Sequence, residues 1–210
     1  MKALPLRELP DELKVLLGNN FVIYEIKSDG ACGPRAAALW LFLDQSLGCN
    51  LAMEINSIYR NNWCYWKDKF SFPFTAAIGR GKDRTFNKAK ELLEFLRTDQ
   101  SAYIWRGQED FAVICTIYRL NIKIYKPDGS PPTVLVPLTD MPNPTNLPDG
   151  KVADLMILHE DECHFNLIVP RDGPLATEGG LDFQRSEKVR LRNEEMLNAR
   201  SAQEDINKDA

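Results

Sequence analysis

One cysteine in this sequence lies at a turn where a thiol can become a nucleophile. Cys32 is flanked by glycines in residues 29–33 (DGACG). Aromatic and β-branched residues predict a strand at 21–26, and a run of helix formers predicts a helix at 36–47. The start of a helix presents unpaired amides and a positive dipole end, and both favour a thiolate. The segment therefore predicts a reactive thiol. The alternative is a buried cysteine that only packs at a helix start.

The residues around Cys32 can also bind a developing oxyanion. The backbone amides of Asp29, Gly30 and Ala31 lie in the same predicted turn as the thiol. Gly30 and Gly33 have no side chains, so they leave room for a substrate backbone to approach. We therefore expect one short loop to hold both the nucleophile and the amides that stabilise negative charge.

A nucleophilic thiol needs a base, and the sequence has two histidines, His159 and His164. Residues two apart on a strand share a face, so Asn166 can bond the ring of His164 while Phe165 turns into the core. An amide oxygen bonded to one ring nitrogen leaves the other nitrogen facing the thiol. His159 has no such partner, and we expect it to be a solvated histidine at the end of a strand. The pattern predicts a site assembled from Cys32, His164 and Asn166.

Helices and strands must bring these segments together. Apolar residues at helical spacing predict further helices at residues 51–69, 87–97 and 109–120. Strand-like composition predicts strands at residues 121–125, 133–136, 153–158 and 165–169. Three prolines within residues 141–150 predict a loop.

The chain of 210 residues is long enough for one sizeable domain with a tail. Residues 6–17 have a short amphipathic pattern that Pro10 interrupts, which predicts an N-terminal helical extension at 1–19. The globular, catalytic domain is expected at 20–172. Beyond it, glycine and charged residues predict a polar tail at 173–210, either flexible or helical.

Composition and charge exclude several classes of protein. Apolar residues make up 44% and charged residues 27%, which is typical of a globular protein. No apolar run approaches the roughly 20 residues that a bilayer span needs, so we expect no membrane partner. The net charge of −4 disfavours a general nucleic-acid binder, because phosphates attract basic surfaces. Residues 1–10 lack a signal-peptide pattern, so the expected location is the cytoplasm, with the nucleus as the alternative.

The soft-ligand side chains do not predict a metal site. The five cysteines are odd in number, widely spaced and without a CxxC pair, which indicates free thiols. A structural zinc site usually takes four ligands at short paired spacings. We therefore expect neither a metal nor a cofactor.

Three segments resemble motifs of the ovarian-tumour (OTU) family of cysteine proteases. Residues 29–32 (DGAC), with Arg35 following, look like the nucleophile motif of that family. Residues 164–166 (HFN), after an apolar strand, look like its histidine motif. Residues 103–109 (YIWRGQE), before a helix and a strand, resemble its Trp-Gly-Gly-x-x-Glu-like element. The three matches follow the family's order and cover about residues 20–170.

The resemblance implies an α+β fold of the papain type, with a central mixed β-sheet between helical lobes. It also implies a thiol-dependent isopeptidase, a deubiquitinase that removes ubiquitin or a ubiquitin-like modifier from lysine side chains. The expected partner is therefore ubiquitin or such a modifier with its conjugates, and we expect the protein to be a monomer.

The family's roles transfer to matching positions of this chain. Cys32 would be the nucleophile, His164 the general base and acid, and Asn166 the residue that orients the histidine. Asp29 would shape the loop near the oxyanion hole, and Trp105 would line the substrate channel. Because an aspartate could also orient the histidine, we expect Asn166→Asp to keep activity.

Two departures from the family pattern affect loops and remove no catalytic group. Gly33 and Pro34 stand where the family usually has a bulky apolar pair, and Arg106 stands where glycine is more common. Two other functions stay open from sequence. One is a catalytically weak, OTU-like ubiquitin-binding module, and the other is a cysteine protease that processes a polyprotein of viral or transposon origin.

Overall fold

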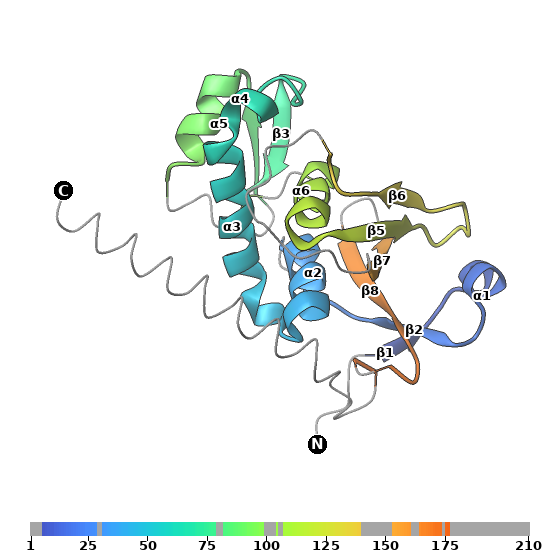
Figure 1. Ribbon diagram of the computed structural model, residues 1–210. Helices are drawn as coiled ribbons and strands as arrows, with labels where there is room; N and C mark the ends of the chain where they lie inside the picture. The colour runs from blue at the N-terminus through green and yellow to red at the C-terminus, as the bar shows by residue number, and fades with distance from the viewer. Residues whose placement is uncertain are drawn as a thin grey trace.

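A six-stranded mixed sheet forms the centre of the computed structural model (Figure 1). The structure describes residues 6–28, 31–78, 82–98, 104, 107–139, 153–160, 164–173 and 175–176. The strands follow the order β1 (Leu6–Glu8), β2 (Phe21–Tyr24), β8 (His164–Pro170), β7 (Ala153–Glu160), β5 (Leu120–Tyr125) and β6 (Thr133–Leu135). The β5–β7 pair is parallel and the other pairs are antiparallel. The β2–β8 pair thus brings an N-terminal strand next to the last described strand.

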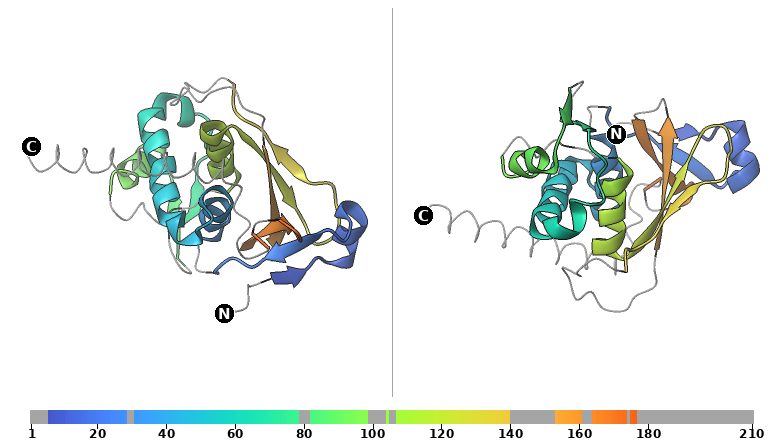
Figure 2. Two further views of the ribbon diagram at one scale, coloured as in Figure 1. Left: turned by 60° about the horizontal axis from the view of Figure 1, so that its bottom comes forward. Right: turned by 90° about the horizontal axis from the view of Figure 1, so that it is seen from above.

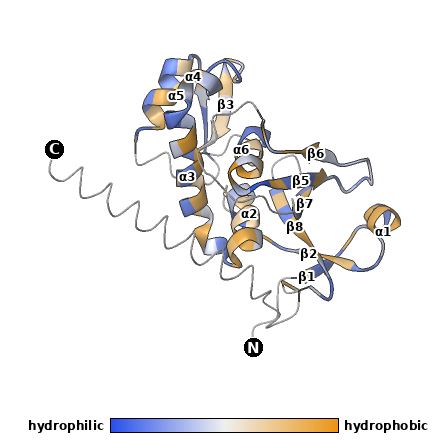
Figure 3. Cartoon of the chain, viewed as in Figure 1, coloured by the Kyte–Doolittle hydropathy of each residue, from blue (hydrophilic) through white to orange (hydrophobic). Residues whose placement is uncertain are grey.

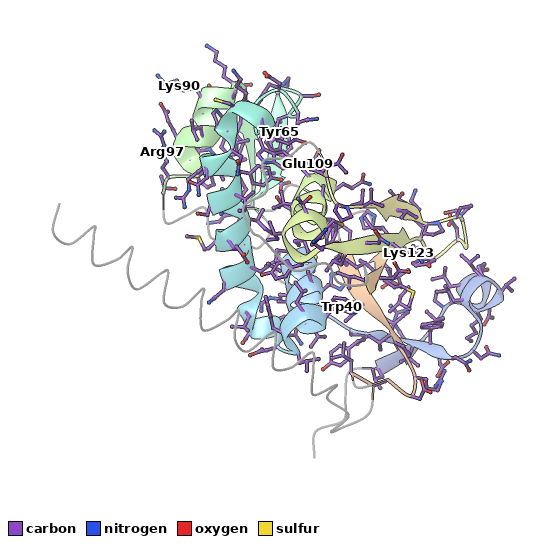
Figure 4. All side chains as sticks on the ribbon, viewed as in Figure 1. Trp40, Tyr65, Lys90, Arg97, Glu109 and Lys123 are labelled. Atoms are coloured by element: carbon purple, nitrogen blue, oxygen red, sulfur yellow. The ribbon has the colours of Figure 1, made fainter. Side chains whose placement is uncertain are left out.

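A layer of helices covers one face of this sheet (Figure 2). Its helices are α2 (Cys32–Phe42), α3 (Gly48–Asn61), α4 (Trp63–Trp66), α5 (Ala89–Phe95) and α6 (Gln108–Tyr118), with a 3-10 turn η1 (Gln45–Leu47) between α2 and α3. Helix α2 packs against β8 and β7, and α6 packs against β5 and β6. Side chains fill the space between these helices and the sheet (Figure 4). A small hairpin of β3 (Phe74–Ala77) and β4 (Asp83–Phe86) lies beside the helices.

Alternation along the central strands divides the core between the two faces of the sheet. On β8, Phe165, Leu167 and Val169 belong to the main core under the helices, whereas Ile168 belongs to a second, smaller cluster. This is the period of two that a strand imposes on its side chains. Apolar residues dominate both β2 and β8, as their colouring in Figure 3 shows. A strand that is apolar on both faces must be covered on both.

Helix α1 (Asp11–Leu17) covers part of the second face. Leu13 is fully buried there against Ile23 and Ile168. At its far side α1 meets the turn after β5, where a Cβ at Gly129 would lie 3.0 Å from the Cβ of Glu12. The sheet therefore lies between helices, as expected, with a thick layer on one face and a single short helix on the other.

Several element boundaries differ from the sequence prediction. The helix expected at 51–69 is divided at Asn62 into α3 and α4, and the helix expected at 36–47 begins earlier, at Cys32. The hairpin β3–β4 was not predicted, because its residues read as a turn and a polar loop. None of the described helices is both long and apolar enough to cross a membrane.

The N-terminal segment is not only helical. Leu6–Glu8 form strand β1, which pairs with β2 in the main sheet, and the helix starts only after Pro10. The predicted boundary between an extension at 1–19 and a domain from 20 therefore cuts through one sheet. A three-residue strand is too short to show a period in sequence. Residues 177–210, most of the predicted tail, lie outside the described residues.

The contact of α1 with the sheet predicts a difference between two substitutions on that helix. Leu13→Ala should lower the free energy of unfolding by about 2–4 kcal/mol, because it empties a buried site. Val15→Ala is the control, since Val15 is 89% exposed on the same helix and its truncation should cost under about 0.5 kcal/mol. Urea denaturation of both variants measures the difference. Equal effects would mean that α1 is not part of the folded core.

Candidate active site

Cys32 is the first residue of α2, and Ala31 is the residue that precedes the helix. The Cys32 side chain is 5% exposed, and Gly33 and Pro34 beside it are buried. No acidic side chain lies in the first turn of α2. The helix start therefore places a positive dipole end at the sulfur, with no carboxylate in that turn to oppose a thiolate.

The loop that leads from β2 to Cys32 is fastened at two points. Its Lys27 amide donates to Oε1 of Gln45 at 3.3 Å, and Arg35 of α2 donates to the backbone oxygen of Gln45 at 2.9 Å. Its Ile26 amide donates to Oδ1 of Asn166 at 2.8 Å. Three segments far apart in sequence thus fix the approach to the thiol.

His164 and Asn166 lie together at the start of β8, as their spacing predicted. Nε2 of His164 is 3.1 Å from Oδ1 of Asn166. Between them Phe165 turns to the opposite face, where its ring meets the edge of Phe111 at a centroid distance of 5.3 Å. One strand therefore supplies the imidazole, its hydrogen-bond partner and an apolar anchor.

The contacts of Asn166 determine which way its amide points. Oδ1 accepts the Ile26 N–H, and Nδ2 donates to Oε2 of Glu160 at 2.7 Å. A rotated amide would place two donors face to face at Ile26 and two acceptors face to face at Glu160. Because Oδ1 can only accept, Nε2 of His164 must carry the proton. The imidazole is thereby held as the Nε2–H tautomer.

The other ring nitrogen of His164 is left as an acceptor. Nδ1 is buried and has no hydrogen-bond partner among the described residues, so the ring is not bonded to the Cys32 thiol through this atom. Hydrogen bonds between a nucleophile and its base are often loose without substrate and tighten when it binds. A buried, unpaired basic nitrogen is what a general base offers before it takes a proton.

Two charged residues complete the group, and sequence reasoning missed both. Arg7 of β1 donates through one guanidinium nitrogen to both carboxylate oxygens of Glu160, at 2.9 and 2.6 Å. The hydrogen bond to Glu160 is the main cause of a raised pKa at Arg7. Glu160 lies opposite His164 in the antiparallel pair β7–β8. A predicted register for this strand pair would have placed Glu160 beside the histidine. Nothing in the sequence indicated Arg7, because β1 was not predicted.

Of the other predicted site residues, the structure describes one and does not describe three. Ala31 is buried next to Cys32, whereas Asp29, Gly30 and Trp105 lie outside the described residues. No three His, Cys, Asp or Glu side chains within the described part of the chain are grouped as metal ligands.

His159 is half-buried, whereas a solvated histidine was expected. Its ring stacks on Phe165 at a centroid distance of 4.5 Å and an angle of 15°. Its Nε2 atom is buried, and within the described residues it has no hydrogen-bond partner. His159 pairs across β7 and β8 with Phe165, so the neighbouring strand covers it.

Solved structures of OTU domains are similar to this chain. The OTU domain of OTUD1 covers 76% of this chain and 93% of its own length, with a TM-score of 0.51 and 16% sequence identity. This chain has the fold of an OTU domain. The viral OTU domain protease from Qalyub virus also matches, over 71% of this chain and 84% of that one, with a TM-score of 0.48 and 16% identity. No protein-family model and no curated protein sequence matches the chain.

The hydrogen bonds of Asn166 predict that an aspartate at this position lowers the stability of the fold. Asn166→Asp would place a carboxylate oxygen against the Glu160 carboxylate, where Nδ2 now donates. At pH 7 we expect the free energy of unfolding of this variant to be about 2–3 kcal/mol lower than that of wild type. The deficit should shrink as the pH falls toward 4, because the folded carboxylate pair binds a proton more tightly than the unfolded chain does.

Asn121→Asp is the matched control for this measurement. Asn121 on β5 also donates to a carboxylate on the neighbouring strand, at 3.1 Å to Oδ1 of Asp154 on β7, but this bond is exposed. Its cost should stay under about 0.5 kcal/mol. Thermal melts at pH 7 and pH 4 compare the two variants. Equal melting temperatures at pH 7 would contradict the assigned amide orientation.

Proposed function

We propose that this protein is a thiol-dependent isopeptidase that hydrolyses conjugates of ubiquitin or of a ubiquitin-like modifier. Cys32 is the nucleophile, His164 is the base and then the acid, and Asn166 orients the histidine. The observation that carries the proposal is the His164 imidazole held as its Nε2–H tautomer, with Nδ1 buried and unpaired, in an OTU-type fold whose α2 begins at a cysteine.

The proposed reaction has two halves. Nδ1 of His164 takes the proton of the Cys32 thiol, and the sulfur attacks the carbonyl carbon of the isopeptide bond. Backbone amides at the start of α2 stabilise the oxyanion. The C–N bond then breaks, His164 gives its proton to the lysine amine that leaves, and the modifier is left as a thioester on Cys32. Water, deprotonated by His164, attacks the thioester, and the thiol leaves with the proton.

The substrate class follows from the fold together with the small residues of the turn. OTU domains generally bind ubiquitin, and the C-terminal glycines of ubiquitin pass only through a narrow channel. Gly33 at the start of α2 has no side chain to obstruct such a chain end. We place this activity in the cytoplasm or nucleus, in a monomer.

A non-catalytic ubiquitin-binding module is the second candidate, and one observation favours it. Cys32 is only 5% exposed, so an attacking thiol needs the turn before α2 to open. Binding of ubiquitin without any reaction at Cys32 is the behaviour that would separate this candidate from an enzyme.

The proposal predicts selective capture of one thiol. Ubiquitin with a C-terminal electrophile should modify Cys32 alone, and Cys32→Ala should abolish the adduct. Cys64 is the internal control, since it is exposed and should react with iodoacetamide but not with the ubiquitin probe. Burial raises the pKa of the Cys115 thiol to about 12, so it should react with neither. Peptide mapping by mass spectrometry locates the adduct, and an adduct on Cys64 or Cys49 would refute the assignment.

Substitution of the two histidines should change different properties, kcat for His164 and the melting temperature for His159. His164→Ala should lower kcat on a di-ubiquitin substrate by a factor of at least about 10², because the base is lost. His159→Ala removes a ring that stacks on Phe165, so it should lower the melting temperature and leave kcat within about 3-fold of wild type. Steady-state kinetics and thermal melts on both variants measure this. The reverse order of kcat values would assign the base to His159.

A further inference from the structure

The neighbourhood of Asn166 contains a carboxylate that the proposed reaction does not use. Glu160, at the end of β7, accepts the Nδ2–H of Asn166 at 2.7 Å. Its other partner is the Arg7 guanidinium, which donates to both of its oxygens. Arg7 in turn lies 3.3 Å from a carboxylate oxygen of Glu25, at the start of the loop to Cys32. A continuous chain of contacts thus runs from Arg7 through Glu160 and Asn166 to His164.

The burial of these side chains distinguishes this series of contacts from a surface ion pair. The Glu160 side chain is 16% exposed and that of Arg7 39% exposed, while Asn166 is buried. A carboxylate largely withdrawn from water is costly unless it is fully bonded. The Glu160 carboxylate is therefore stable in this position only while both Arg7 and Asn166 donate hydrogen bonds to it.

The direction of each hydrogen bond determines what Glu160 does to the histidine. A carboxylate accepts only, so it requires the NH₂ group of Asn166 to face it. The Ile26 N–H requires the amide oxygen to face the opposite way. Charge-assisted bonds are about twice as strong as neutral ones, and bonds in series polarise one another. Asn166 is neutral, and the carboxylate of Glu160 supplies a negative charge one hydrogen bond further from the imidazole.

We propose that Glu160, held by Arg7, is a positioning residue that fixes the amide of Asn166 and through it the Nε2–H tautomer of His164. The inference rests on the proposed function for its role in hydrolysis, but the tautomer itself does not depend on any substrate. It also makes the N-terminal strand β1 a working part of the site. The same strand carries Glu8, which pairs with Arg171 at 2.8 and 2.9 Å and touches neither histidine nor Asn166.

The test uses an exchange of hydrogen-bond polarity between two positions. In Glu160→Gln the new NH₂ group faces the Arg7 guanidinium in either orientation, and when it takes the position of Oε2 it also faces Nδ2 of Asn166. Asn166→Asp alone sets two carboxylates against each other. In the double variant Glu160→Gln/Asn166→Asp, the new amide can donate to the new carboxylate while its oxygen accepts from Arg7. The hydrogen bonds of residue 166 to Ile26 and to residue 160 are then both made again and Arg7 keeps one of its two, with the charge moved next to His164.

The primary measurement is the ¹H–¹⁵N spectrum of the histidine rings, which is simple because the chain has only two histidines. Wild type should show His164 as Nε2–H, and so should the double variant. Glu160→Gln should lose a substantial part of that signal, whereas the control Glu8→Gln should match wild type. An unchanged His164 tautomer in Glu160→Gln, or a double variant that fails to restore it, would overturn the proposal.

Kinetics on a di-ubiquitin substrate give the second reading. Glu160→Gln should lower kcat by roughly 10-fold with KM within about 2-fold, because an orienting contact is lost and no substrate contact is touched. The double variant should recover to within about 3-fold of wild type, and Glu8→Gln should equal wild type. A rise in KM together with the fall in kcat, or an equal fall of kcat in Glu8→Gln, would indicate a general structural effect and refute positioning.

The two readings separate this inference from the proposed function. A wild-type protein that does not react with the ubiquitin probe but shows the expected tautomer shifts would refute the function and keep the role of Glu160. Should Glu160→Gln alone fail to fold, the comparison of Asn166→Asp with the double variant carries the test. Failure of the double variant to recover both the melting temperature and the tautomer would then refute the proposal.

Discussion

A single amide oxygen joins the two halves of this molecule's site. Oδ1 of Asn166 accepts the Ile26 N–H from the loop that leads to Cys32, and it also meets Nε2 of His164 on its own strand. A carbonyl oxygen has two lone pairs, so both contacts can be made at once. The position of the thiol loop and the tautomer of the imidazole therefore depend on one buried group.

The rest of the fold can be understood as what keeps that group buried and correctly turned. Helix α2 packs against β8, and α1 covers the second face of the sheet. Phe165 anchors β8 in the main core between His164 and Asn166. A buried polar group needs hydrogen-bond partners, and the carboxylate of Glu160 supplies the acceptor for Nδ2 of Asn166. Polar contacts and apolar packing thus fix the same strand from its two faces.

The part of the site that follows from local rules could be predicted from sequence. His164 and Asn166 share a face because strand side chains have a period of two, and Cys32 starts a helix because a glycine-flanked turn precedes a run of helix formers. Most of the strands and helices were predicted from the same kind of pattern, whereas the mixed sheet was implied by the resemblance to OTU proteases. Glu160 was missed because its contact depends on the register between β7 and β8, and Arg7 because three residues carry no readable period. The stacking of His159 on Phe165 was missed for the same reason, since Phe165 lies on the next strand.

The strand order has a consequence for synthesis of the protein. Ile26 and Asn166 are 140 residues apart in the chain, and Arg7 and Glu160 are 153 apart. A ribosome therefore releases the thiol and β1 long before β7 and β8, a delay on the order of 10 s at ordinary elongation rates. During that time the nascent chain carries Cys32 without His164, Asn166 or Glu160 beside it. Because β8 pairs with β2, the proposed catalytic centre can assemble only after β8 has been made.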